Sequence, residues 1–487
     1  MMLTAGQIVL ICALGAVAAL IIFMVVRTLL TKKKVIETAQ FRPLNLDVDS
    51  IANNLSKAIQ IPTITVISPE QSYEPFLEYH KFLEETYPLI FKNGEKTVIN
   101  GYSLIIKLTG SDESLLPVAF LAHQDVVPAP KKGWEHEPFG GEIKDGFVHG
   151  RGSQDMKGQM IANLEAMEYL LSQGKELKRT VYFCFGHDEE YTGKDGAKQI
   201  VEYLYENNIR FECVYDEGGT VLDGKMLGID GKIALIGTCE KGYVDYTLTS
   251  TISGGHAASP KRISAVDTLA EAVYMLRSIP MKAYWSQPVK DMFKDLAPHM
   301  KPLFKFIFVN RDILSPLLKL LLVKIHPVGA SIMRTTFAFT QIKGSDAPNV
   351  IPPSATAVVN CRINIGQTQK DVEKHIKKVV GKNIKLDRLT EGYDPSPVSD
   401  ITSEPYAKLK KSIVEVFPDF IPVPYPFIAA TDAKHYYKIC DNVFRFTPFE
   451  LTPEDQKRIH ALNERCDIDA LATATQFYVR LIENTCM

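Results

Sequence analysis

The chain has 487 residues, which predicts about three average domains or two large ones. Its 46% hydrophobic and 23% charged residues are typical of a globular protein and exclude a disordered or fibrous one. A net charge of -2 provides no basic field for a polyanion, so nucleic-acid binding is not expected. The eight cysteines include no CxxC pair, which excludes a zinc ribbon and favours buried free thiols over a disulfide framework.

An apolar segment at residues 8–26 predicts a helix that spans a membrane. Arg27 and the lysine cluster at residues 32–34 follow this segment, and no basic residue precedes it. This order favours a retained single-pass anchor over a cleaved signal peptide. The lysine cluster favours a cytoplasmic location for the rest of the chain, whereas a glycosylation sequon at residues 54–56 points to the other side.

From residue 118 onward, short β-rich segments alternate with helical ones. Strands are expected at residues 118–122, 180–185 and 211–215, with helices at residues 158–173 and 195–207. This order predicts an α/β domain with a mixed, mostly parallel sheet covered by helices, in which ligands bind beyond the carboxyl ends of the strands. Alternating apolar and polar residues from about residue 243 predict a second, α+β unit inserted into the first.

Acidic and imidazole side chains follow the predicted strands and begin the first long helix. Each group alone has an ordinary explanation as a structural HxD pair, a solvated acidic pair, a helix cap or a turn. Gathered at one sheet edge, however, these acids would repel one another unless a cation neutralised them. The candidates are His123, Asp125, Asp155, Glu189, Glu190, Asp216 and His460.

Imidazole and carboxylate ligands without cysteine suit catalytic Zn²⁺, Co²⁺ or Mn²⁺. Two metal ions that share a bridging carboxylate need about five ligands. Asp125 lies two residues from His123 on the same strand face and is placed to orient its ring. Glu189 is then left to take a proton from water. The predicted ligands are His123, Asp155, Glu190, Asp216 and His460.

Seven motifs, taken in chain order, resemble those of the M20 metallopeptidases, which include aminoacylases, carboxypeptidases and acetylornithine-type deacetylases. The motifs are LAHQDVVP, GRGSQDMKG, DEEYTG, DEGG, SGGHAASP, NVIPP and RIHALNE. Three longer segments resemble the branch of carboxypeptidase S and the N-fatty-acyl-amino acid hydrolases and synthases. These segments are GWEHEPFGG, FKFIFVNRDILSPLLKLLL and FRFTPFELTPEDQKRIHALNE.

The resemblance implies a role for each residue of the predicted metal site. It assigns His123 and Asp216 to one ion, Glu190 and His460 to the other, and Asp155 to both. It makes Asp125 the residue that orients His123, Glu189 the general base and acid, and the Asp155–Met156 peptide cis. The catalytic domain is expected at residues 41–241 and 367–487, behind a membrane anchor and linker at residues 1–40.

An inserted lid is expected at residues 242–366. Within it, the resemblance implies that His256 polarises the scissile carbonyl and that Asn349 and Arg362 contact the substrate. Lys434 stands where relatives carry Arg, so it keeps the charge but loses a bidentate grip on a carboxylate. The sequence of residues 301–326 predicts two short apolar helices separated by Ser315-Pro316. These helices would form the core of the lid, a wall for an acyl chain or a surface that lies against the bilayer.

The expected function is hydrolysis of the amide bond of N-acyl amino acids with hydrophobic acyl groups. The reaction is reversible, so condensation of a fatty acid with an amino acid is also expected. One alternative is a membrane-anchored metallocarboxypeptidase that acts on hydrophobic peptides. An alternative of another class is a non-catalytic, membrane-tethered binding protein. A homodimer through the lid is implied by the resemblance.

Overall fold

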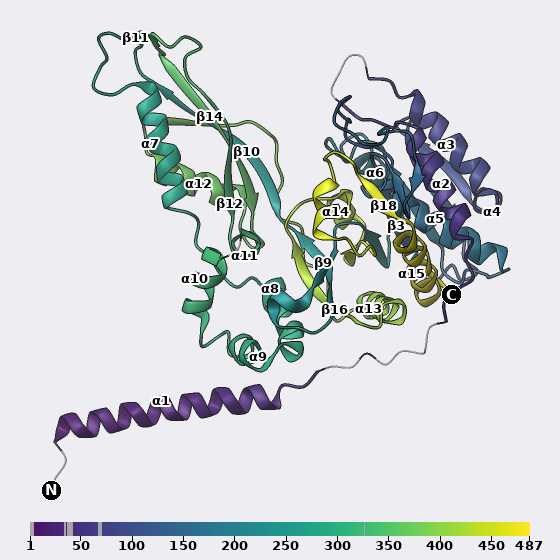
Figure 1. Ribbon diagram of the computed structural model, residues 1–487, viewed down its shortest axis with the longest axis horizontal. Helices are drawn as coiled ribbons and strands as arrows, with labels where there is room; N and C mark the ends of the chain where they lie inside the picture. The colour runs from purple at the N-terminus through teal and green to yellow at the C-terminus, as the bar shows by residue number, and fades with distance from the viewer. Residues whose placement is uncertain (1–3, 34–35, 37–41, 67–70, 326) are drawn as a thin grey trace. The chain divides into compact units, whose positions relative to one another are not determined.

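The computed structural model describes residues 4–33, 36, 42–66, 71–325 and 327–487, and it divides into two compact units (Figure 1). The sheet unit comprises Glu37–Leu222, Ile233–Gly242 and Pro395–Met487. The insert unit comprises Met1–Ile36, Asp223–Lys232 and Tyr243–Asp394. The domain boundaries expected from the sequence stay predictions.

The sheet unit is built on a mixed sheet whose centre is parallel. Strands β6, β3, β7 and β17 run parallel to one another, and β1 and β2 continue the sheet in antiparallel fashion. Among the described residues the sheet has nine strands, and β8 (Thr220–Asp223) pairs with β9 outside the main path. The order is β1 (Glu95–Ile99), β2 (Ser103–Leu108), β6 (Val181–Gly186), β3 (Val118–His123), β7 (Cys213–Asp216), β17 (Val443–Arg445), β9 (Lys232–Glu240) and β16 (Phe420–Phe427).

Helices cover both faces of this sheet. Because successive side chains of a strand point to opposite faces, Phe120 and Phe183 enter one core while Leu121 and Cys184 enter the other. Burial on both faces explains why these strands are continuously apolar in sequence. The first core is closed by α2 (Val48–Gln60), α5 (Lys157–Ser172), α13 (Glu404–Val416) and α15 (Ile468–Cys486), and the second by α6 (Ala197–Glu206) and the 3-10 helix η3 (Asp432–Lys438).

Shorter elements complete the sheet unit. The three predicted strands are β3, β6 and β7, and the two predicted helices are α5 and α6, with ends that differ by at most two residues. All eight cysteines are free, and every one except Cys12 is buried. The remaining elements are α3 (Glu74–Thr86), α4 (Pro88–Asn93), α14 (Pro453–Arg458) and a small sheet of β18 (Arg465–Asp467), β5 (Phe147–His149) and β4 (Ile143–Lys144).

The insert unit contains a four-stranded sheet packed against two helices. One face of β10 and β14 is buried and the other half-exposed, as the alternating sequence predicts. The sheet order is β12 (Thr336–Lys343), β14 (Ser354–Ile363), β10 (Gly242–Thr251) and β15 (Ile384–Arg388), and the helices are α7 (Ala265–Ser278) and α12 (Gln369–Val380). A separate ribbon pairs β11 (Gly255–His256) with β13 (Val350–Ile351).

The rest of the insert unit is helical. The prediction that Ser315 and Pro316 separate two helices is wrong, because both residues lie in the first turn of α10. Proline is tolerated there, because the backbone N–H that it lacks would have no acceptor within the helix. The break lies instead at residues 310–314. The helices are α1 (Ala5–Leu30), η1 (Gly224–Leu227), α8 (Gln287–Leu296), η2 (Ala297–His299), α9 (Pro302–Val309), α10 (Ser315–Ile325) and α11 (Pro327–Met333).

Helix α1 contains the apolar segment at residues 8–26. Among the described residues it is the helix long and apolar enough to cross a membrane, a test that a signal sequence also passes. Its side chains are almost all exposed, and Met24 is buried. Of the predicted lysine cluster, Lys32 and Lys33 follow the helix, whereas Lys34 lies outside the described residues.

Candidate metal centre

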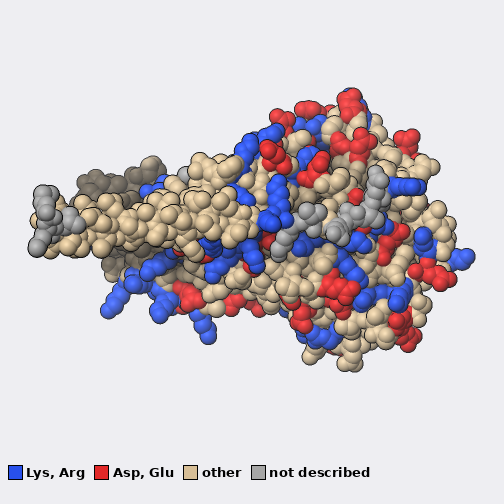
Figure 2. Space-filling model, turned by 90° about the horizontal axis from the view of Figure 1, so that it is seen from below, with Lys and Arg blue, Asp and Glu red and all other residues tan. Residues whose placement is uncertain are grey.

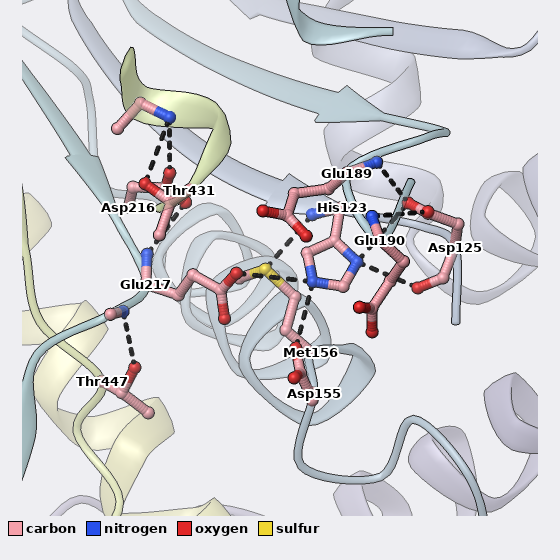
Figure 3. Close-up of polar contacts among 12 residues, drawn as sticks. His123, Asp125, Asp155, Met156, Glu189, Glu190, Asp216, Glu217, Thr431 and Thr447 are labelled. Atoms are coloured by element: carbon pink, nitrogen blue, oxygen red, sulfur yellow. Dashed lines mark hydrogen bonds and ion pairs between the residues drawn. The ribbon is translucent and has the colours of Figure 1, made fainter. Parts of the chain in front are cut away.

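His123 ends strand β3 and is the centre of the site (Figure 3). Its Nε2 lies 3.1 Å from Asp155 Oδ1 and 3.4 Å from Glu217 Oε1. Its Nδ1 lies 2.9 Å from the backbone carbonyl oxygen of Asp125. A carbonyl oxygen only accepts, so Nδ1 carries the proton in the neutral ring, and the lone pair of Nε2 faces the carboxylates. This is the tautomer that binds a metal through Nε2.

Asp155 connects this histidine to a second one. Its Oδ2 lies 3.0 Å from His460 Nε2, which also lies 3.0 Å from Glu190 Oε2. Asp155 therefore reaches one imidazole with each of its two oxygens, the arrangement of a carboxylate that bridges two cations. The Asp155–Met156 peptide is cis, as the resemblance implied.

Asp125 aligns the acidic loop that follows β6. Its Oδ1 accepts a hydrogen bond from the backbone N–H of Glu189 at 3.1 Å, and its Oδ2 accepts one from the N–H of Glu190 at 3.0 Å. The same buried carboxylate has its Oδ1 3.5 Å from Nδ1 of His123. Asp125 thus holds the His123 ring through its backbone carbonyl and the backbone of both acids through its side chain.

Asp216 lies beside the cluster without facing His123, and its predicted role as a metal ligand stays a prediction. This residue ends β7, and its two carboxylate oxygens accept backbone N–H groups, from Glu217 at 2.8 Å and from Ala433 at 3.0 Å. Glu217 instead extends toward His123, and Asp216 turns away (Figure 3). Because neighbouring residues at the end of a strand point in opposite directions, only one of the two acids can face the cluster.

The donor atoms fit a divalent metal centre. In the part of the chain that the structure describes, ligand atoms lie within 4.8 Å of one another in two groups that share His123, one with Asp155 and Glu190 and the other with Glu189 and Glu217. These nitrogen and oxygen donors, without sulfur, are those of catalytic zinc sites.

Electrostatics indicate that the cluster needs positive charge. Burial, followed by the charge of Asp155, raises the pKa of Glu217 to about 7, and burial raises the pKa of Glu189 well above its ordinary range. Hydrogen bonds to Asp155 and Glu190 raise the pKa of His460 to about 10. Burial therefore favours the neutral, protonated forms of Glu189 and Glu217, and a divalent cation at the same place would displace those protons.

Glu464 is a positioning residue that the sequence-based prediction missed. Its Oε1 accepts the backbone N–H groups of Gln154 at 2.9 Å and Asp155 at 3.2 Å, and its Oε2 pairs with the buried guanidinium of Arg151. It thereby holds the glycine-rich turn that carries Asp155. The only sequence signal was that Arg151 and Glu464 belong to two of the quoted motifs.

The predicted substrate-binding residues are distributed over both units. Lys434 lies in η3 of the sheet unit, and its charge lowers the pKa of Glu189, against the larger effect of burial. In the insert unit, His256 of β11 is exposed, and the N–H of Ala257 donates to the carbonyl oxygen of Asn349 at 3.1 Å, so the ribbon brings these two segments together. Arg362 lies on β14, where its guanidinium is 5.0 Å from the centre of the Tyr243 ring.

Comparison with known proteins identifies the family. Residues 119–484 match peptidase family M20/M25/M40. The chain is 37% identical to the N-fatty-acyl-amino acid synthase/hydrolase PM20D1 of Xenopus tropicalis, across 88% of this chain and 85% of that protein. It is 36% identical to the probable carboxypeptidase S-like 2 of Dictyostelium discoideum, across 89% of this chain and 85% of that protein.

Solved structures show the same fold at low sequence identity. The M20 family metallo-carboxypeptidase of Sulfolobus solfataricus superposes with a TM-score of 0.65 at 18% identity, across 89% of this chain and 98% of that one. Human carnosine dipeptidase 1 gives a TM-score of 0.61 at 15% identity, across 90% of this chain and 96% of that one. The chain therefore belongs to peptidase family M20/M25/M40 and is an M20-type metallohydrolase.

Proposed function

We propose that this enzyme is a di-metal hydrolase that cleaves the amide bond of N-acyl amino acids with hydrophobic acyl groups. The observation that carries the proposal is Asp155, whose two oxygens contact the imidazoles of His123 and His460. Relatives from Xenopus tropicalis and Homo sapiens named N-fatty-acyl-amino acid synthase/hydrolase support the substrate class. As with other amide hydrolyses, the reverse condensation is expected from the same site.

The five proposed ligands follow from the contacts of the cluster. His123 and Glu217 would hold one ion, Glu190 and His460 would hold the other, and Asp155 would contribute one oxygen toward each pair. We propose Zn²⁺, with Co²⁺ and Mn²⁺ as substitutes that suit the same donors. When bound, the two ions would supply Lewis acidity that activates water and polarises the amide carbonyl.

Glu189 performs the proton transfers. Its carboxylate accepts a proton from the attacking water and returns it to the leaving amine. Burial raises the pKa of Glu189, which makes its carboxylate a stronger base than an exposed one. Asp125 holds the backbone of Glu189 in place during these steps.

Substrate contacts are proposed for four further residues. His256 donates to the oxyanion that develops on the amide carbonyl, and Asn349 contacts the substrate backbone. Arg362 binds the terminal carboxylate, because the two parallel N–H groups of a guanidinium match a carboxylate. Lys434 contributes a positive charge on the sheet unit but lacks this paired geometry.

We further propose that residues 8–26 remain as a single-pass anchor and that the rest of the chain lies on the side of Lys32 and Lys33. The sequon that argued for the opposite side is weakened, because Asn54 Nδ2 donates to Glu165 Oε1 at 2.7 Å and is therefore engaged. Extraction of the expressed protein from membranes at alkaline pH, combined with intact-mass measurement, tests the anchor. Recovery in the soluble fraction, or a mass that lacks residues 1–26, would contradict it.

A substrate panel tests the activity. The full-length enzyme is loaded with Zn²⁺, Co²⁺ or Mn²⁺ and given N-acyl amino acids of increasing chain length beside blocked hydrophobic dipeptides. We expect kcat/KM to rise by up to about fourfold per methylene, because burying a CH₂ contributes about 0.8 kcal/mol. Glu189→Gln provides the background rate. Preference for the dipeptides would favour the carboxypeptidase, and absence of bound metal and of chelator-sensitive activity would favour the binding protein.

A further inference from the structure

The C-terminal end of α1 is fastened to the turn between α9 and α10. Met24, Arg27 and Thr28 lie on one face of α1, because they are three and four residues apart. The buried side chain of Asn310 donates from Nδ2 to the carbonyl oxygen of Met24 at 3.2 Å and to Thr28 Oγ1 at 3.0 Å. Arg27 Nη2 pairs with Asp312 Oδ2 at 3.1 Å. We refer to these five residues as the anchor clamp.

The clamp fixes the depth of this turn relative to the proposed anchor. Arg27 directly follows the apolar segment at residues 8–26, so it lies where the hydrocarbon layer meets the lipid headgroups. Figure 2 shows the helix as an unbroken uncharged surface, with Lys and Arg side chains gathered beyond its end. Helices α9 and α10, about 12 and 17 Å long, begin or end beside the clamp and therefore stay near the headgroup layer.

Helices α9 and α10 each pack against the rest of the insert unit on one side and expose apolar side chains on the other. Phe308 of α9 stacks on Phe293 at 4.4 Å, and Ser315 of α10 accepts a hydrogen bond from Trp285 Nε1 at 2.9 Å. Such outward apolar groups favour a partner that removes them from water. These side chains, which we name the lid patch, are Leu303, Phe304, Leu317, Leu320 and Leu321.

The segment that carries the lid patch is mainly basic, and one of its lysines, Lys301, pairs with Asp230 at 3.6 Å. Asp312 is the only acidic residue between positions 301 and 324, and the clamp pairs it with Arg27. The basic residues of the same segment are Lys301, Lys305, Arg311, Lys319 and Lys324. Apolar side chains interspersed with lysines on short helices are typical of segments that lie in a membrane interface.

We propose that α9 and α10 lie in the headgroup layer of an anionic phospholipid bilayer, beside the anchor. The lid patch enters the acyl boundary, and the lysines bind lipid phosphates. This inference rests on the proposed anchor, and it holds the insert unit at the surface in which a fatty-acyl substrate dissolves. A membrane-bound lid would then meet its substrate by diffusion within the bilayer, not from bulk water.

Environment-sensitive labels on the full-length enzyme test this contact. Leu303→Cys and Ile342→Cys form a matched pair, because both side chains are aliphatic, belong to the insert unit and are 68% exposed. Cys12, the exposed native thiol, is replaced by Ser, while the buried thiols are left. Each variant is labelled with a nitrobenzoxadiazole maleimide and placed in nanodiscs of phosphatidylcholine and phosphatidylserine that carry spin-labelled lipid.

We expect the label at position 303 to be quenched by spin-labelled lipid at least about threefold more than the label at position 342, with the reverse order for aqueous iodide. Lys319→Glu with Lys324→Glu should lower the quenching at position 303, and so should nanodiscs without phosphatidylserine. Equal lipid quenching at positions 303 and 342 would overturn the proposal.

Two measurements on the same nanodiscs separate this proposal from the proposed function. The intact mass shows whether residues 8–26 are retained. Equal quenching with the anchor retained refutes the lid contact alone, whereas loss of the anchor refutes both the anchor and the lid contact. Hydrolysis of a short-chain, water-soluble N-acyl amino acid tests the chemistry independently of lipid, so an inactive enzyme with strong quenching at position 303 supports the lid contact and contradicts the proposed activity.

Discussion

Replacing Asp125 with Asn tests whether one buried carboxylate aligns the metal ligands. The two oxygens of Asp125 accept the backbone N–H groups of Glu189 and Glu190 at 3.1 and 3.0 Å. Asn offers one oxygen, so one of these N–H groups loses its partner. Orphaning a buried donor costs about 1–3 kcal/mol. If the loop that carries Glu189 and Glu190 shifts to relieve this loss, the same free energy is subtracted from metal binding. A free-energy change of about 1.4 kcal/mol alters a binding constant tenfold, so metal affinity should fall by about 5-fold to 150-fold.

The assay is a competitive titration of zinc against a chelator, followed by kcat/KM at saturating metal. Asp188→Asn is the matched control, because Asp188 also accepts two backbone N–H groups, from Asp195 at 2.9 Å and Gly196 at 2.8 Å, but neither belongs to a proposed ligand. We expect its metal affinity to stay within about twofold of wild type. Equal losses for the two variants, or none for Asp125→Asn, would refute the reasoning.

Three further predictions concern the acids. Glu189→Gln should retain both metals and lower kcat by about 10²–10⁴-fold in single-turnover assays, and a rate near wild type would remove Glu189 from its role. Burial and Asp155 raise the pKa of Glu217 from 4.5 to about 7, so below pH 7 a proton competes with the metal and metal affinity should fall by up to about tenfold per pH unit. The metal-free folded state holds this proton more tightly than the unfolded state, so its stability should decrease as the pH rises from about 4.5 to about 7. Calorimetric titrations at several pH values check both, and Glu217→Gln should flatten the dependence. Glu240→Gln should weaken the fully buried ion pair with Arg445 and destabilise the sheet unit by about 3–5 kcal/mol, and an unchanged unfolding midpoint would contradict this.

The central elements of the fold were predictable because their patterns have a single physical explanation. Strands β3 and β6 are buried on both faces, so their sequences are continuously apolar and end at polar residues. The break before α10 was misplaced for the opposite reason. Pro316 is compatible both with ending one helix and with beginning another, and only tertiary packing decides between them.

The site shows where sequence reasoning ends. Adjacent acids such as Asp216 and Glu217 point to opposite sides of a strand, so a shift of one residue in where β7 ends exchanges their roles. The sequence does not fix that position to one residue. Glu464 is separated from Arg151 by 313 residues, and only the fold brings the two together. The roles assigned to His256 and Arg362 stay predictions.

The most direct test of the metal centre counts ions on single chains. Native mass spectrometry of the zinc-loaded, full-length enzyme released from detergent micelles gives the number of bound ions for wild type, Glu217→Ala and Asp216→Asn. We predict two ions for wild type and for Asp216→Asn, and at least one fewer for Glu217→Ala. Wild-type enzyme with fewer than two bound zinc ions, or Glu217→Ala that keeps both ions, would contradict a two-metal centre built on Asp155 and Glu217.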